Sequence, residues 1–151
     1  MIENNVIYVF SKVIIPIMTT VISVGVSTLI SVYLDKKKDV NNLLDKLNSI
    51  LSVAVQYPYL ESKNFAEKWS PEQTESDERY LRYEQYVILV FNYLEEVCKF
   101  FRFKKKKIEK FIGIKEWVRI HGKYWSSPTE AYANSDTYDE KFKAIVKSYL
   151  Q

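Results

Sequence analysis

The strongest chemical signal in this 151-residue chain is a concentration of positive charge between residues 99 and 124. That segment has ten Lys and Arg side chains and two Glu side chains, whereas residues 70–97 have seven acidic side chains and two Arg. Basic side chains form charge-assisted hydrogen bonds with phosphate, and an aromatic ring can stack on a base. The segment therefore predicts a site for a polyphosphate or short oligonucleotide, formed by Lys104, Lys105, Lys106, Lys107, Arg119, His121, Lys123 and Tyr124.

Two other interpretations of these charges stay open. A basic segment near a membrane is attracted to anionic lipid headgroups, at about 1 kcal/mol per lysine. Alternatively, the lysines form a solvated helix face that balances the acidic segment, because charged side chains mostly remain in water. The sequence does not choose between phosphate binding, headgroup binding and solvation.

The sequence lacks the residue patterns of common enzymes and metal sites. It has no glycine-rich phosphate loop, no HExxH pair and no GxSxG motif. Cys98 is the one cysteine and His121 the one histidine, so the chain cannot form an internal disulfide or a Cys/His zinc site. We therefore expect a protein that is not an enzyme and that carries no cofactor and no metal.

These residues must be positioned by a chain that begins with a strongly apolar stretch. Residues 13–34 contain no charged side chain, and a helix of that length covers roughly 33 Å, enough to cross a bilayer. Asp35 and then Lys36, Lys37 and Lys38 follow, which predicts a cytoplasmic C-terminal side and an outward N-terminus. The stretch is long for a secretory signal and no cleavage motif follows it, so we expect a retained single-pass anchor.

One face of this predicted span carries hydroxyl groups. They lie within about 120° of the helical wheel, at Thr19, Thr20, Ser23, Ser27 and Ser31. In lipid, such a face packs against another helix or borders water in an oligomeric pore. The alternative is that each hydroxyl bonds a carbonyl of its own helix.

The remaining sequence predicts further helices. Apolar side chains follow a heptad spacing from Asp39 to a point before Pro58, at Val40, Leu43, Leu47, Ile50 and Ala54, and Leu44 and Leu51 widen this stripe to the width of a core-facing surface. No helix breaker separates this pattern from the span, so the helix is expected to continue out of the membrane.

Residues 80–103 form the densest apolar segment and predict a central, buried helix. Other helix starts are predicted near Ser70 or Asp77, at Ser127 with Pro128 and Glu130, and at Thr137 with Glu140. The expected fold is all-α, with an anchor over residues 1–38 and a cytosolic bundle of about five to six helices over residues 39–151.

Three short segments carry a resemblance to known proteins: residues 91–95 (FNYLE), 125–128 (WSSP) and 138–142 (YDEKF). Over most of the cytosolic part they resemble a broad group of bacterial membrane-anchored proteins. The layout of one span and a small basic helical domain is similar to transmembrane effectors of antiphage defence. These include a type III CRISPR effector gated by cyclic oligoadenylate and the Hailong effector controlled by an oligodeoxyadenylate. No binding residue can be matched one by one.

That resemblance implies a homo-oligomer, with a tetramer favoured, in the bacterial inner membrane. Its partners would be membrane lipid and a cyclic or linear oligonucleotide, and not duplex nucleic acid. The resulting hypothesis is a defence effector that permeabilises the inner membrane when a nucleotide binds its cytosolic domain. The rival hypothesis is a membrane-tethered interaction module without pore activity, and a third is a phage-borne inhibitor.

Overall fold

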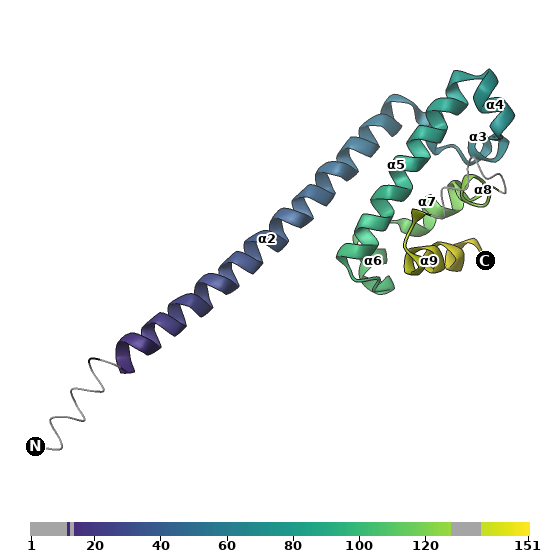
Figure 1. The fold of residues 1–151 in the computed structure, drawn as a ribbon. Helices are drawn as coiled ribbons and strands as arrows, with labels where there is room; N and C mark the ends of the chain where they lie inside the picture. Colours follow the sequence, from purple (N-terminus) through teal and green to yellow (C-terminus); the bar gives the residue numbers. More distant parts are fainter. Residues whose placement is uncertain (1–11, 13, 128–136) are drawn as a thin grey trace, which may run out of the picture. The chain divides into compact units, whose positions relative to one another are not determined.

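The computed structural model describes residue 12, residues 14–127 and residues 137–151. Every element in these ranges is a helix, so the all-α prediction is confirmed (Figure 1). The chain divides into two compact units, residues 1–42 and residues 43–151.

Helix α2 spans Ile15–Gln56 and contains most of the predicted membrane span. Within the described ranges it is the one helix that is long and apolar enough to cross a membrane. The part of α2 that belongs to the first unit exposes large apolar side chains, including Met18, Leu29 and Val32. Exposing so many apolar groups to water would be unfavourable, whereas lipid removes that cost.

The helix continues without a break through residues 35–42, as the absence of Pro and Gly predicts. Helix α2 ends at Gln56, and a short 3-10 helix begins at Pro58. The expected continuity of the span with the following amphipathic helix is therefore confirmed.

The second unit surrounds one long helix with shorter ones. After α2 come η2 Pro58–Glu61, α3 Lys63–Lys68, α4 Pro71–Ser76, α5 Glu78–Phe100, α6 Lys105–Phe111, α7 Ile114–Ile120, α8 Gly122–Trp125 and α9 Glu140–Leu150. The expected number of five to six was too low even for the described residues. The excess comes from short helices of one or two turns, such as α7 and α8, which divide a segment that its apolar spacing predicts as one helix.

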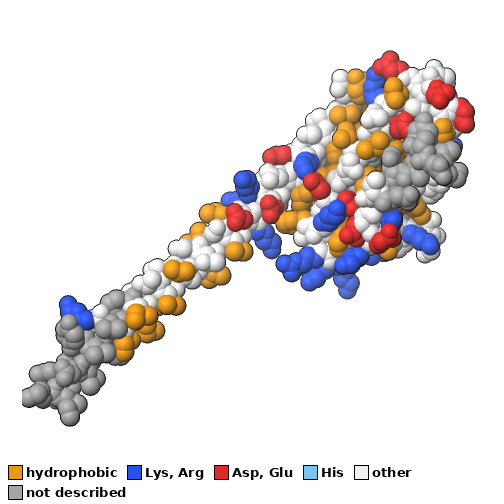
Figure 2. Space-filling view, in the orientation of Figure 1, with side chains coloured by type: hydrophobic (Ala, Val, Ile, Leu, Met, Phe, Trp, Pro, Cys, Tyr) orange, Lys and Arg blue, Asp and Glu red, His pale blue; other side chains and the backbone are white. Residues whose placement is uncertain are grey.

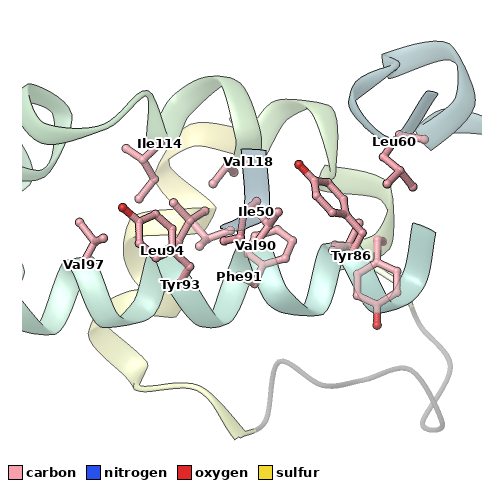
Figure 3. Packing of buried hydrophobic residues seen from close by; sticks show 14 of the residues in the cluster. Ile50, Leu60, Tyr86, Val90, Phe91, Tyr93, Leu94, Val97, Ile114 and Val118 are labelled. Atoms are coloured by element: carbon pink, nitrogen blue, oxygen red, sulfur yellow. The ribbon is translucent and has the colours of Figure 1, made fainter. Parts of the chain in front are cut away.

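Helix α5 is the centre of the core, as its apolar run predicts. Val87, Val90 and Leu94 are fully buried, and Phe91 and Tyr93 are nearly so. Figure 3 shows Ile50 from α2 and Ile114 and Val118 from α7 on one side of this helix. The opposite side of α5 is exposed, for example at Leu81 and Leu89. Burying apolar area along the inward side of this helix is the main favourable contribution to the stability of such a bundle.

The ends of α5 are set by local hydrogen bonds and backbone geometry. The Asp77 carboxylate accepts a hydrogen bond from the Arg79 backbone N–H at 2.8 Å and caps the start. The helix ends at Phe100, three residues before the predicted end. Arg102 and Phe103 adopt positive φ angles of 51° and 57°, a left-handed conformation that reverses the chain toward α6.

The last helix also starts differently from the prediction. Asp139, not Thr137, caps α9, because its carboxylate accepts a hydrogen bond from the Lys141 N–H at 2.8 Å. The predicted helix start at Pro128 and Glu130 lies outside the described residues.

Candidate functional site

Four consecutive lysines lie at the start of α6 and are all exposed. Lys104 is the N-cap residue, and Lys105, Lys106 and Lys107 form the first turn. Figure 2 shows Lys and Arg side chains gathered over this part of the second unit. The first turn has no acidic residue, so the positive end of the helix dipole meets four positive charges. This arrangement disfavours the helix and leaves an electropositive surface.

Packing holds α6 in place despite this repulsion. Ile108 is fully buried, and the Phe111 ring packs against Phe101 with the centroids 5.2 Å apart. Buried aromatic and aliphatic contacts of this kind outweigh a dipole effect of roughly 0.3–1 kcal/mol per charge. The lysine positions are therefore set by the apolar side of the helix.

One lysine of the four has partners inside the protein. The Lys105 ammonium lies 4.2 Å from the Tyr149 ring centroid and donates to the Ser148 hydroxyl at 3.0 Å. The Tyr149 hydroxyl in turn donates to Glu109 at 2.9 Å, and the Lys115 ammonium lies 4.0 Å from the same carboxylate. These contacts join α6, α7 and α9.

Lys104, Lys106 and Lys107 differ from Lys105, because no side-chain partner is recorded for them in the described residues. We refer to these three side chains as the lysine surface. An anion approaching it would meet positive charge that is not already neutralised within the protein.

His121 lies inside the second unit and is fully buried. Its Nδ1 atom lies 3.1 Å from the Tyr83 hydroxyl, and its Nε2 atom lies 3.8 Å from Glu61 Oε1. The Tyr86 hydroxyl donates a short hydrogen bond to the same Glu61 oxygen. We call Glu61, Tyr83, Tyr86 and His121 the buried polar cluster. It joins η2, α5 and the end of α7.

The electrostatics of this cluster favour a charged Glu61 and neutral tyrosines. Burial raises the pKa of the Glu61 carboxyl, but His121 and Tyr86 lower it more, so the pKa lies below its ordinary value of 4.5. Burial raises the pKa of Tyr83 and Tyr86, which keeps both hydroxyl protons in place. Nε2 of His121 has no hydrogen-bond partner among the described atoms.

The structure does not bring the predicted phosphate site together. His121 and Tyr124 are 0% and 4% exposed, and Tyr124 packs on Trp69 with the ring centroids 4.9 Å apart. Burial leaves neither side chain open to an external phosphate or base in this structure, and their role as ligand residues stays a prediction. In the sequence, His121 and Tyr124 follow Trp117 by four and seven residues. Residues at this spacing share one face of a helix, so the pattern could have indicated that both side chains are buried.

Arg119 and Lys123 remain at the surface but in different surroundings. The Lys123 ammonium donates to the Glu67 carbonyl at 2.8 Å and thereby joins α8 to α3. Arg119 is exposed on α7. A ligand role for Lys104–Lys107 and Arg119 stays a prediction, while Lys123 already has an internal acceptor.

The hydroxyl groups of the span divide into two kinds. All five predicted side chains are exposed on α2, and Thr19 bonds the Ile15 carbonyl at 3.0 Å. For Ser23, Ser27 and Ser31 no side-chain hydrogen bond is recorded among the described residues. Thr28, which lies outside the predicted face, also bonds a carbonyl of its own helix. Self-bonding therefore accounts for some hydroxyls but not for the three serines.

The sequence did not indicate an open groove between α5 and the second-unit part of α2. It has a volume of about 600 Å³ and is lined by Ile50, Leu89, Tyr93 and other side chains. A Lys46–Glu96 ion pair with an N–O distance of 2.6 Å crosses it, and the buried Tyr93 hydroxyl has no partner among the described atoms. A groove with apolar walls and charged rims suits a peptide or helix of a partner protein.

No group of three His, Cys, Asp or Glu side chains in the described ranges could hold a metal ion. Cys98 is buried, and burial raises the pKa of its thiol to about 12. No known family, curated protein or solved structure matches this chain.

Proposed function

We propose that this protein is a membrane-anchored effector of bacterial defence that assembles in the inner membrane and permeabilises it when a nucleotide binds the cytosolic unit. The observation that carries the proposal is the continuity of α2. One uninterrupted helix contains the exposed apolar span and the residues Leu43, Ile50 and Ala54 that are buried in the second unit. We expect a change in the packing of this helix to reach the span, because one helical backbone contains both segments.

The lysine surface supports an anionic signal. Lys104, Lys106 and Lys107 have open positive charge on a well-packed helix, and phosphate oxygens are strong acceptors for ammonium groups. A ligand shifts the assembly only by as much as it binds one state more tightly than the other. We therefore expect one of two arrangements. Either the phosphates contact lysines from more than one copy of the chain, or they contact the lysines of a single copy in only one of its two conformations.

The serines of the span support permeabilisation. Ser23, Ser27 and Ser31 recur every four residues, and their hydroxyls need acceptors that lipid cannot supply. Facing helices or pore water would provide them. The cytoplasmic position of the second unit follows from Lys36–Lys38 and is part of the proposal.

The test uses the full chain reconstituted into vesicles that contain a self-quenching dye. Adding cyclic or linear oligoadenylates of about four to six nucleotides, the lower end of the site sizes of single-strand binding surfaces, should release the dye. Replacing Ser23, Ser27 and Ser31 by Leu should abolish release. A control with Leu at Val21, Thr28 and Val32, which lie about 120° around the helix from the three serines, should retain it.

Release that survives the triple serine replacement would reject the pore. No release with any of these oligonucleotides would reject oligoadenylate as the signal. A protein that is extracted from cell membranes without detergent would reject the anchor itself.

The groove favours a second candidate function, a membrane-tethered interaction module. Leu89 lines the groove and is exposed. An exposed leucine in an apolar groove is typical of a surface that a partner protein covers. On this hypothesis, Leu89→Asp abolishes function in cells while the triple serine replacement leaves function intact. The effector hypothesis predicts the reverse pattern.

A further inference from the structure

The second-unit part of α2 has two apolar faces, and only one of them is covered. Leu43, Ile50 and Ala54 are buried in the bundle. Leu44, Leu51 and Val55 are instead 41%, 42% and 79% exposed. The packing of the bundle therefore does not explain why these three positions are apolar.

The exposed positions follow the spacing of a coiled-coil seam. Starting at Asn41, steps of three and four residues lead in turn to Leu44, Asn48, Leu51 and Val55. In heptad notation, Asn41, Asn48 and Val55 occupy a positions, and Leu44 and Leu51 occupy d positions. Leucine at d with asparagine at a is the pattern of parallel coiled coils, in which the buried Asn fixes register and partner number.

The asparagines and the flanking residues fit a partner with the same sequence. Asn41 and Asn48 are exposed, and among the described residues no hydrogen bond to the side-chain amide of either is present; the Ser52 hydroxyl bonds only the Asn48 backbone carbonyl. An asparagine at a is best paired by the same asparagine of an identical helix. The positions beside the seam from residue 40 to residue 54 contain one charged side chain, Asp45, so identical helices would meet little like-charge repulsion.

We propose that Asn41, Leu44, Asn48, Leu51 and Val55 form the surface on which a second copy of this chain docks, as a parallel coiled coil. The proposal rests on the membrane anchoring proposed above and deepens it by naming the contact through which the copies assemble. Copies inserted with the same topology present their α2 helices in the same direction, which is the orientation that a parallel seam requires.

Counting the same register toward the N-terminus reaches Leu34, Ile30, Ser27, Ser23 and Thr20 in sequence. Three of the five hydroxyl positions predicted to face another helix therefore share the seam register. Lys37 falls on a d position in this count, and like charges of two copies would repel each other there. The register is thus interrupted at the membrane boundary, and the cytosolic seam begins at Asn41.

Cysteine cross-linking of the full chain in vesicles tests this surface. Cys98 is buried with a raised thiol pKa, so the wild-type chain should not react with a short bis-maleimide. Leu44→Cys and Leu51→Cys should give about tenfold more cross-linked dimer than Asn42→Cys and Ser49→Cys, the matched pair two positions before each. Equal yields in the two pairs, or no dimer in either, would overturn the proposal.

A second measurement uses the mass of the full chain in neutral detergent. Leu44→Gln with Leu51→Gln should reduce the assembly to single chains, because a polar side chain at d removes the apolar contact. Leu81→Gln, which changes an exposed leucine of α5 that does not line the groove, should leave the mass unchanged. Circular dichroism should show unchanged helix content in both variants. An assembly that survives the α2 replacements would contradict the docking surface.

These results are separable from the test of the proposed function. A chain that cross-links at Leu44→Cys and Leu51→Cys but releases no dye keeps the docking surface and rejects the permeabilising role. A chain that releases dye without those cross-links keeps the role and rejects the surface.

Discussion

The lysine surface and the buried polar cluster come from one basic segment of sequence, yet they have opposite environments. Lys104, Lys106 and Lys107 are exposed, at the end of a helix whose dipole repels them. His121 is fully enclosed by tyrosines and a carboxylate. Charge that is available to a ligand is thus separated in space from the polar groups that stabilise the fold. Substitutions that alter one region at a time should therefore affect either binding or stability.

The largest expected effect is on ligand binding at the lysine surface. Replacing Lys104, Lys106 and Lys107 by Gln should weaken binding of a labelled linear oligoadenylate by about 3 kcal/mol, on the order of a hundredfold, if each lysine contributes about 1 kcal/mol. Fluorescence anisotropy of the full chain in neutral detergent measures this. The melting temperature should stay the same or rise, since charges that oppose the α6 dipole are removed.

The matched control replaces Lys63 and Lys68 on α3 and Lys147 on α9 by Gln, which changes the net charge equally without altering a lysine of α6. If the control weakens binding as much as the test variant does, the lysine surface is no more than part of a diffuse positive field. The slope of log affinity against log salt should become shallower by about 0.7 for each phosphate that the test variant no longer neutralises.

The next effect is on stability, through the buried polar cluster. Glu61→Ala removes the acceptor of Tyr86 and leaves His121 without its neighbouring carboxylate. We expect a loss of about 2–3 kcal/mol in the free energy of unfolding, seen as a melting temperature lowered by roughly 10 °C. Glu67→Ala, at an exposed position of α3, should change stability by less than about 0.5 kcal/mol.

A smaller loss is expected from removing one hydroxyl of the cluster. Tyr83→Phe deletes the partner of His121 Nδ1 and should lower the free energy of unfolding by about 1 kcal/mol. Tyr80→Phe is the matched control, because the Tyr80 ring stacks on Phe65 at 4.4 Å and that contact is retained. Equal melting temperatures for the two variants would show that the Tyr83–His121 contact contributes nothing.

The smallest effect is the pH dependence that Glu61 confers. Its pKa is lowered in the folded state, so the unfolded state takes up the proton first as the pH falls. The contribution of Glu61 is therefore fully present above its ordinary pKa of 4.5 and is lost as the pH falls through the folded-state value. Thermal melts between about pH 3 and pH 6, a range that includes the ordinary pKa of a glutamate carboxyl, test this dependence. The melting temperature should depend less on pH for Glu61→Gln than for the wild type.

Sequence patterns predicted the helices, whereas the ligand role of the site residues stays a prediction. The uncharged stretch before Leu34 and the absence of breakers up to Gln56 were sufficient to predict α2, because both are local properties of the chain. The central position of α5 was predicted from the run Val87 to Phe91, which is apolar on every side, although Leu89 within it is exposed. The end of α5 was missed because two non-glycine residues, Arg102 and Phe103, take a left-handed conformation that nothing in their types indicates.

The site prediction grouped residues by type and nearness in sequence. His121 and Tyr124 were placed with the lysines although their spacing from Trp117 already matched an inward face. The partners of His121, namely Glu61 and Tyr83, lie 60 and 38 residues earlier in the chain, and no local pattern connects them.

The sequence by itself determined the apolar span, the all-α class and the cluster of basic residues, since length, hydropathy and charge act locally along the chain. Tertiary structure alone decided which polar side chains are enclosed and which lysines stay open. It also decided that one apolar face of α2 is covered while Leu44 and Leu51 remain exposed. The physical reason is that burial depends on neighbours brought together by packing, and packing joins residues that are distant in sequence.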